Sequence, residues 1–149
     1  MPSELSASCS VIEECYEYML AYAGQGLAGG EGTGQDGLIR DFLGRAAQAL
    51  AGLEKAYASA IEQRGLHSVP HSGPNPTGAY AAFQAVLARD ARDSLVAVEL
   101  VLAQATISSQ LIDNLNASIH VRALLTDLFL IDEVLKTQLS ARNSEDGVG

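Results

Sequence analysis

Hydrophobic residues along this chain recur with the 3.6-residue period of an α-helix in four segments. The pattern predicts helices over residues 3–23, 36–64, 76–110 and 115–140. In the second segment, apolar side chains form one narrow seam at i, i+3 and i+4 spacing, as expected of an amphipathic helix. The seam consists of Ile39, Leu43, Ala46, Leu50, Leu53, Tyr57 and Ile61. Four such helices predict an all-α fold, an antiparallel four-helix bundle that forms one domain over residues 1–149.

The second half of the chain is the longest stretch without a helix breaker. No glycine or proline occurs over residues 79–146, and Asn75 and Pro76 just before it suit a helix N-cap and a first helical position. The apolar stripe of the third helix nevertheless loses its phase, and a new stripe begins out of register at Val121. This change predicts a turn within residues 108–116, between two antiparallel helices. One long helix is the alternative that the sequence leaves open.

Three segments lack the helical pattern. Residues 24–37 are rich in glycine, so they are expected to form a flexible loop. The second loop, residues 65–76, contains three prolines, which restrict its backbone. Residues 141–149 have no apolar stripe, and we expect a disordered tail there.

The charge balance excludes several classes of partner. The net charge is −9, and nine Lys and Arg stand against 18 Asp and Glu, with no basic cluster. Because nucleic acids and anionic membranes attract clustered positive charge, we expect neither as a partner. The first residues show no basic region followed by an apolar run, and the most apolar window is too short to cross a bilayer. A cytoplasmic location is therefore expected.

Two short motifs suggest a cofactor or a metal, and the context of each argues against it. Residues 32–37 spell the glycine pattern of dinucleotide-binding loops, but a predicted helix rather than a strand precedes them. His67 and His71 have the spacing of zinc ligands on a helix, but Pro70 between them disfavours a helix. No Glu-x-x-His sequence occurs, as a di-metal bundle requires. We therefore expect no cofactor and no metal.

Several polar residues fall on the apolar side of the third and fourth predicted helices. Asp90, Ser94 and Gln104 interrupt the third helix, and His120 and Asp127 interrupt the fourth. Buried polar groups need hydrogen-bond partners, so the first interpretation of Asp90, Gln104, His120 and Asp127 is an internal network that fixes the helix register. Exposure at the end of the bundle or at a subunit seam is the second interpretation. The third is a ligand or catalytic pocket that uses His120 as a base or ligand.

The two cysteines are poorly spaced for a disulfide. On one helix, Cys9 and Cys15 are separated by about 9 Å along the axis, whereas a disulfide needs Cα atoms within about 7 Å. We expect two free, packed thiols.

The apolar arc of the third predicted helix covers more than half of its circumference, which is wider than a solvated bundle requires. This surplus favours a symmetric homodimer, with Leu100 and Ile107 as candidate interface residues because they lie two turns apart on one side of that helix. The leading hypothesis is a non-enzymatic, self-associating adaptor, scaffold or accessory subunit, which could also bind another protein. The alternative is a small-molecule- or metal-binding bundle, which could be an enzyme, with a polar pocket around His120 and Asp127.

Overall fold

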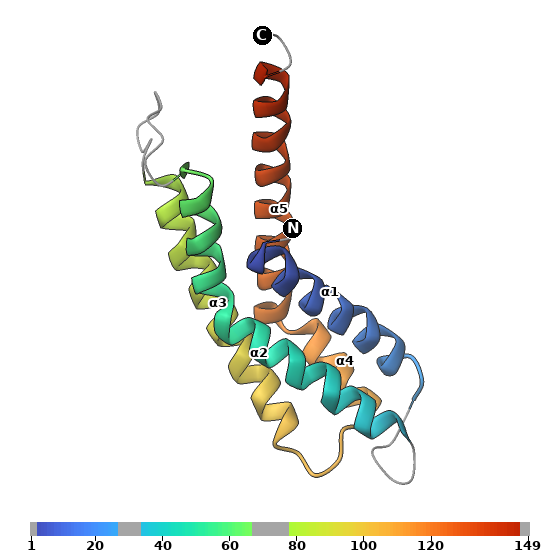
Figure 1. The fold of residues 1–149 in the computed structure, drawn as a ribbon. Helices are drawn as coiled ribbons and strands as arrows, with labels where there is room; N and C mark the ends of the chain where they lie inside the picture. Colours follow the sequence, from blue (N-terminus) through green and yellow to red (C-terminus); the bar gives the residue numbers. More distant parts are fainter. Residues whose placement is uncertain (1–2, 27–33, 67–77, 147–149) are drawn as a thin grey trace.

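The computed structural model describes residues 3–26, 34–66 and 78–146, with side chains described as far as residue 137 and Gly34 excepted. Within these ranges the chain forms helices and no strand, which confirms the all-α class. The helices are α1 (Glu4–Ala23), α2 (Gly34–Gln63), α3 (Ala79–Leu102), α4 (Ser109–Ala117) and α5 (Ile119–Asp146) (Figure 1).

Serine side chains begin three of the helices. The Ser3 hydroxyl accepts a hydrogen bond from the backbone N–H of Ser6 at 3.1 Å and caps α1. The Ser108 hydroxyl accepts from the N–H of Leu111 at 3.1 Å and caps α4. Before α5, the Ser118 hydroxyl accepts from the N–H of His120 at 3.2 Å. Each bond satisfies a backbone donor that has no partner inside its own helix.

These caps correct the prediction for the second half of the chain. The third helix ends at Leu102 instead of residue 110, and the segment 108–116, predicted to be a turn, is mostly the short helix α4. The chain therefore breaks twice, before α4 and again at Ser118, without glycine or proline at either break. Serine caps take the place of glycine and proline at these breaks. After extended backbone, a serine hydroxyl can accept a hydrogen bond from a free backbone N–H at the start of the next helix.

The other predicted boundaries shift by smaller amounts. α2 begins at Gly34, so the last part of the predicted 24–37 loop is helical, while residues 27–33 lie outside the described residues. α2 is followed by Gly65 at φ +68°, a backbone conformation that glycine adopts without strain. The remainder of the predicted proline-rich loop, 67–77, also lies outside the described residues. α5 continues to Asp146, so most of the expected disordered tail, 141–149, is helical.

α2 is the central helix, and it packs against α1 and against α3. Both of these neighbours run antiparallel to it (Figure 1). α4 packs mainly against α1, and α5 packs against α3. Figure 1 shows that α5 and the α2–α3 pair diverge, so that the C-terminal part of α5 projects well beyond the start of α1.

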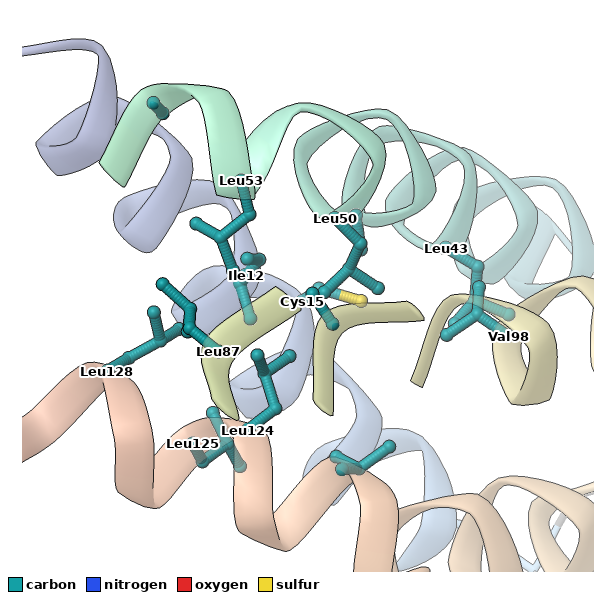
Figure 2. Packing of buried hydrophobic residues seen from close by; sticks show 14 of the residues in the cluster. Ile12, Cys15, Leu43, Leu50, Leu53, Leu87, Val98, Leu124, Leu125 and Leu128 are labelled. Atoms are coloured by element: carbon teal, nitrogen blue, oxygen red, sulfur yellow. The ribbon is translucent and has the colours of Figure 1, made fainter. Parts of the chain in front are cut away.

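One hydrophobic core joins these helices. Figure 2 shows Ile12 and Cys15 of α1 between Leu50 of α2 and Leu124 of α5, with Leu87 of α3 beside them. All seven residues of the apolar seam predicted for the second helix are buried, which confirms that part of the helical phase. Burial of such aliphatic side chains contributes roughly 1.5–3 kcal/mol each. The core therefore holds all five helices together, with α5 contributing as far as Leu135.

Candidate functional site

Asp90 and Asp127 come together between α3 and α5, as two of the four residues of the predicted polar network. Asp90 of α3 is the charged neighbour of Asp127 on α5, and Asp127 is 7% exposed. The Oδ2 atom of Asp127 has no hydrogen-bond partner. Burial, together with the neighbouring carboxyl group of Asp90, raises the pKa of Asp127 to about 7. Asp127 therefore keeps its proton to a higher pH than an ordinary carboxyl group.

Ser94 and His120 form a second polar connection between the same helices. Ser94 is fully buried, as predicted from its place on the apolar face, and its hydroxyl donates to the backbone carbonyl oxygen of His120 at 2.9 Å. The imidazole of His120 points to Asp93, with Nδ1 at 3.9 Å from the Asp93 Oδ2 atom. The side chains of His120 and Asp93 are 52% and 44% exposed, so this contact lies at the surface, at the edge of the region where α3 and α5 pack together.

His120 and Gln104 are not part of a buried network, so the prediction was wrong for these two residues. Gln104 lies beyond the end of α3, where it is exposed and its side-chain amide donates to the Leu100 carbonyl at 2.9 Å. His120 lies in the first turn of α5, where no preceding turn of the same helix covers its side chain. Of the four, only Asp127 is buried, and Asp90 beside it is half-buried.

The two predicted interface residues have different surroundings. Leu100 is 66% exposed on α3, and Val96 one turn before it is also exposed. Ile107 is completely buried, so it is not available for a partner and its assignment to an exposed seam was wrong. The reason is that α3 ends at Leu102, and Ile107 lies in the connection to α4 instead of on the same helix as Leu100.

Arg40 of α2 anchors the connection between α3 and α4, a role that the sequence pattern did not reveal. Its guanidinium donates to the carbonyl oxygens of Leu102 at 3.1 Å, Gln104 at 2.8 Å and Ala105 at 3.1 Å. Its Nε atom also pairs with the Asp36 carboxylate at 3.0 Å. The planar fork of donors suits several carbonyls at once, and the positive charge suits the C-terminal end of a helix.

Two further hydrogen bonds hold the same connection against α1. The Tyr22 hydroxyl donates to the Ile107 carbonyl oxygen, and the Ser109 hydroxyl donates to the Tyr22 carbonyl oxygen at 2.7 Å. Tyr22, Ile107 and Ser109 are all buried. The end of α1 therefore fixes where α4 begins.

The apolar groove, as we name it, lies where α5 diverges from the α2–α3 pair (Figure 1). Its volume is about 410 Å³. Leu130 and Val134 of α5 form one wall and are 53% and 37% exposed. The rings of Tyr57 and Phe83 lie opposite, with centroids 6.0 Å apart. The complete lining is Tyr57, Ala79, Tyr80, Phe83, Leu130, Ile131 and Val134, and none of these side chains is charged.

The described residues contain no group of three His, Cys, Asp or Glu side chains placed to hold a metal ion. None of the helices, as far as they are described, combines the length and apolar character needed to cross a bilayer. The chain matches no protein-family model, no curated protein and no solved structure. The site must therefore be interpreted from its own geometry.

Proposed function

We propose that this protein is a non-enzymatic helical module that associates with a second copy of itself and serves as an adaptor, scaffold or accessory subunit. The observation that carries the proposal is the apolar groove between α3 and α5. Monomeric proteins rarely leave a large contiguous apolar surface in water, and such surfaces commonly mark sites of protein association.

A second copy suits the groove because the same end of the molecule offers a matching ridge. Leu130 and Val134 are one helical turn apart on the exposed side of α5, and Phe129 beside them is also exposed. In a two-fold dimer the same patch occurs on both subunits, so the ridge of each α5 can fill the groove of the other. This proposed dimer contact takes the place of the interface that the sequence predicted at Leu100 and Ile107.

Charge supports the same location. Two copies that each carry a net charge of −9 repel one another, and the repulsion is least where no ionised side chain enters the contact. The apolar groove meets this condition, because its lining has no charged residue. Aromatic side chains such as Phe83, which is half-buried, also bury large areas at interfaces.

Sedimentation velocity on matched pairs of variants tests the proposal. Leu130→Glu combined with Val134→Glu places two charges in the groove of each subunit and should convert a dimer into a monomer at micromolar concentration. Val96→Glu combined with Leu100→Glu, a control on the exposed face of α3, should leave the dimer intact. Circular dichroism must first show that both variants keep the helical content and melting temperature of the wild type.

The outcomes are distinct. A wild type that sediments as a monomer up to about 100 µM, a concentration at which even weak dimers form, would exclude self-association. A dimer lost only in the Val96 and Leu100 variant would move the interface to the exposed face of α3. A dimer unaffected by either pair would exclude both surfaces.

A small-molecule- or metal-binding function around His120 and Asp127 is the second candidate. The unpartnered Oδ2 atom of buried Asp127 is the observation in its favour, because buried carboxylate oxygens usually have partners. The half-exposed position of His120 weakens it. Native mass spectrometry with elemental analysis separates the candidates: a stoichiometric metal or small molecule supports the second, and an unliganded dimer supports the first.

A further inference from the structure

The outer face of α3 carries a second stripe of side chains, apart from the apolar groove. The α3 stripe, as we name it, consists of Ala82, Val86, Arg89, Asp93, Val96 and Leu100. These residues are separated alternately by four and three positions, which is the heptad spacing of a helix face that packs along one other helix. Val86, Val96 and Leu100 are 42%, 60% and 66% exposed, and Ala82 and Arg89 are exposed as well. The stripe of a single copy therefore faces solvent.

The α3 stripe is complementary to itself about the level of Ala91. Residues equally far before and after Ala91 form matched pairs: Arg89 with Asp93, Val86 with Val96, and Ala82 with Leu100. When two copies of a helix run antiparallel around a two-fold axis, residues equally far from the axis meet across the contact. Each matched pair then occurs twice, as a cation against a carboxylate, a valine against a valine, and a small side chain against a large one.

We infer that the α3 stripe is a second self-association surface, on which α3 of another copy docks antiparallel with Arg89 of each copy opposite Asp93 of the other. The inference goes beyond the dimer proposed at the apolar groove and does not depend on it. If both contacts form, each chain has two different two-fold interfaces, and these join dimers into larger assemblies. Such growth suits a scaffold.

The charges of the stripe select the antiparallel arrangement. In the part of the chain that the structure describes, Arg89 has no ion-pair partner. Asp93 lies 3.9 Å from the imidazole of His120, and its side chain is 44% exposed, so a second copy can reach it. A parallel pair would place Arg89 against Arg89 and Asp93 against Asp93. Because like charges that face each other oppose association, the antiparallel pair is favoured.

The surface beside the stripe is hollowed, which gives room for a second helix. A depression of about 720 Å³ lies between α2 and α3, and both Arg89 and Asp93 line it. Ala51 of α2 and Ala85 and Ala88 of α3 also line it. Small side chains opposite large ones allow two surfaces to interdigitate. The long side chain of an incoming Arg89 therefore has space beside Asp93.

The contact through the stripe should be weaker than the contact through the groove. From Ala82 to Leu100 the stripe is about 27 Å long, and a contact along one helix face is small among protein interfaces. Exposed Arg92 lies on the flank of the stripe and approaches Arg92 of the other copy near the axis, which adds a like-charge pair. We expect association through the stripe at about 100 µM. At the lower concentrations of the groove test, the Val96 and Leu100 pair therefore remains a valid control.

Charge reversal in the groove variant, Leu130→Glu with Val134→Glu, tests the stripe by itself. In sedimentation equilibrium up to about 500 µM, this parent variant should form dimers at the upper end of the range. Adding Arg89→Asp or Asp93→Arg should raise the dissociation constant by more than about tenfold, because either change places like charges opposite each other twice. In the otherwise wild-type chain, the same changes should remove species larger than the dimer. Circular dichroism must show unchanged helical content in each variant.

The control separates local from overall charge. Arg45→Asp, at an exposed arginine of α2, alters the net charge as much as Arg89→Asp does and should leave the association of the parent variant unchanged within about twofold. Asp93→Arg makes the acidic chain less negative, so overall repulsion falls. A loss of association in Asp93→Arg therefore arises at the contact itself.

Restoration identifies the arrangement. Arg89→Asp and Asp93→Arg combined in one chain should return the dissociation constant to within about threefold of the parent, because opposite charges meet again across an antiparallel pair. A parent variant that stays monomeric over the whole range, unchanged association in either single reversal, or no recovery in the combined variant overturns the inference. Failure of the groove proposal is a different result: wild-type association that Leu130→Glu with Val134→Glu leaves unchanged.

Discussion

Removal of the Arg40 guanidinium should destabilise the fold more than removal of any other surface charge on α2. The side chain connects α2 to three carbonyl oxygens at the end of α3, at distances of 2.8–3.1 Å. Arg40→Ala leaves those carbonyls to water and frees the connection that leads into α4. The change therefore affects the junction of three helices.

The expected magnitude follows from the exposure of each bond. Hydrogen bonds that involve a charged group contribute about 1.5–3 kcal/mol when they are well buried. The bond to Leu102 is partly buried, whereas the bonds to Gln104 and Ala105 are exposed and count for less. We estimate a loss of about 2 kcal/mol in the free energy of unfolding for the whole set. For a chain of this length, that corresponds to a fall of about 4–8 °C in melting temperature.

Urea denaturation of two Arg40 variants and one matched control measures this loss. Arg40→Lys keeps the charge near the helix end but presents a single ammonium, so it should recover less than half of the loss. Arg45→Ala is the control on the same helix. Arg45 pairs with exposed Asp41 at 3.5 Å and lies over Phe42, which together are worth less than about 1 kcal/mol. Equal losses in Arg40→Ala and Arg45→Ala would refute the argument that Arg40 holds the end of α3.

Three further substitutions or reactions test the core. Leu53→Ala should lower the free energy of unfolding by about 2–5 kcal/mol in urea denaturation, because Leu53 is fully buried and truncation leaves a cavity; a loss below 1 kcal/mol would contradict the packing. Ser94→Ala should cost about 1 kcal/mol, because the His120 carbonyl loses its buried hydroxyl donor; a neutral result would place that hydroxyl in water. Burial raises the pKa of Cys15 to about 12, so its thiol should react with a thiol reagent much more slowly at pH 8 than after unfolding; equal rates would show that α1 does not cover it.

The sequence predicted the helical faces best where one helix runs without interruption between two neighbours. α2 is such a helix, because α1 and α3 pack along it, and every residue of its predicted seam is buried. Under these conditions the angle around the helix axis alone determines which side chains meet the core. Ser94 on α3 was placed correctly for the same reason, with α5 packed against that face.

The breaks in the second half of the chain could be predicted only in part. The change of apolar phase indicated that one straight helix does not fit, but it did not show where the helices end. The ends depend on long-range bonds from Arg40 and Tyr22, which lie on other helices. They also depend on the serines at 108 and 118, which act as caps only because the preceding backbone is not helical. The apolar pattern within one segment does not show which residues of other helices will bond to its ends.

Two of the three wrongly placed site residues, Ile107 and His120, share one cause. Leu100 and Ile107 are seven residues apart, as are His120 and Asp127, and two helical turns place such residues on nearly the same side. Two residues on the same side of a helix have the same surroundings only if the helix is unbroken and other helices pack along its whole length. α3 ends between Leu100 and Ile107, so Ile107 turns into the core while Leu100 stays exposed. His120 and Asp127 do share α5, but only Asp127 lies far enough along the helix to be covered by its neighbours. The same geometry leaves Asp127 in the interior and His120 half-exposed at the start of α5.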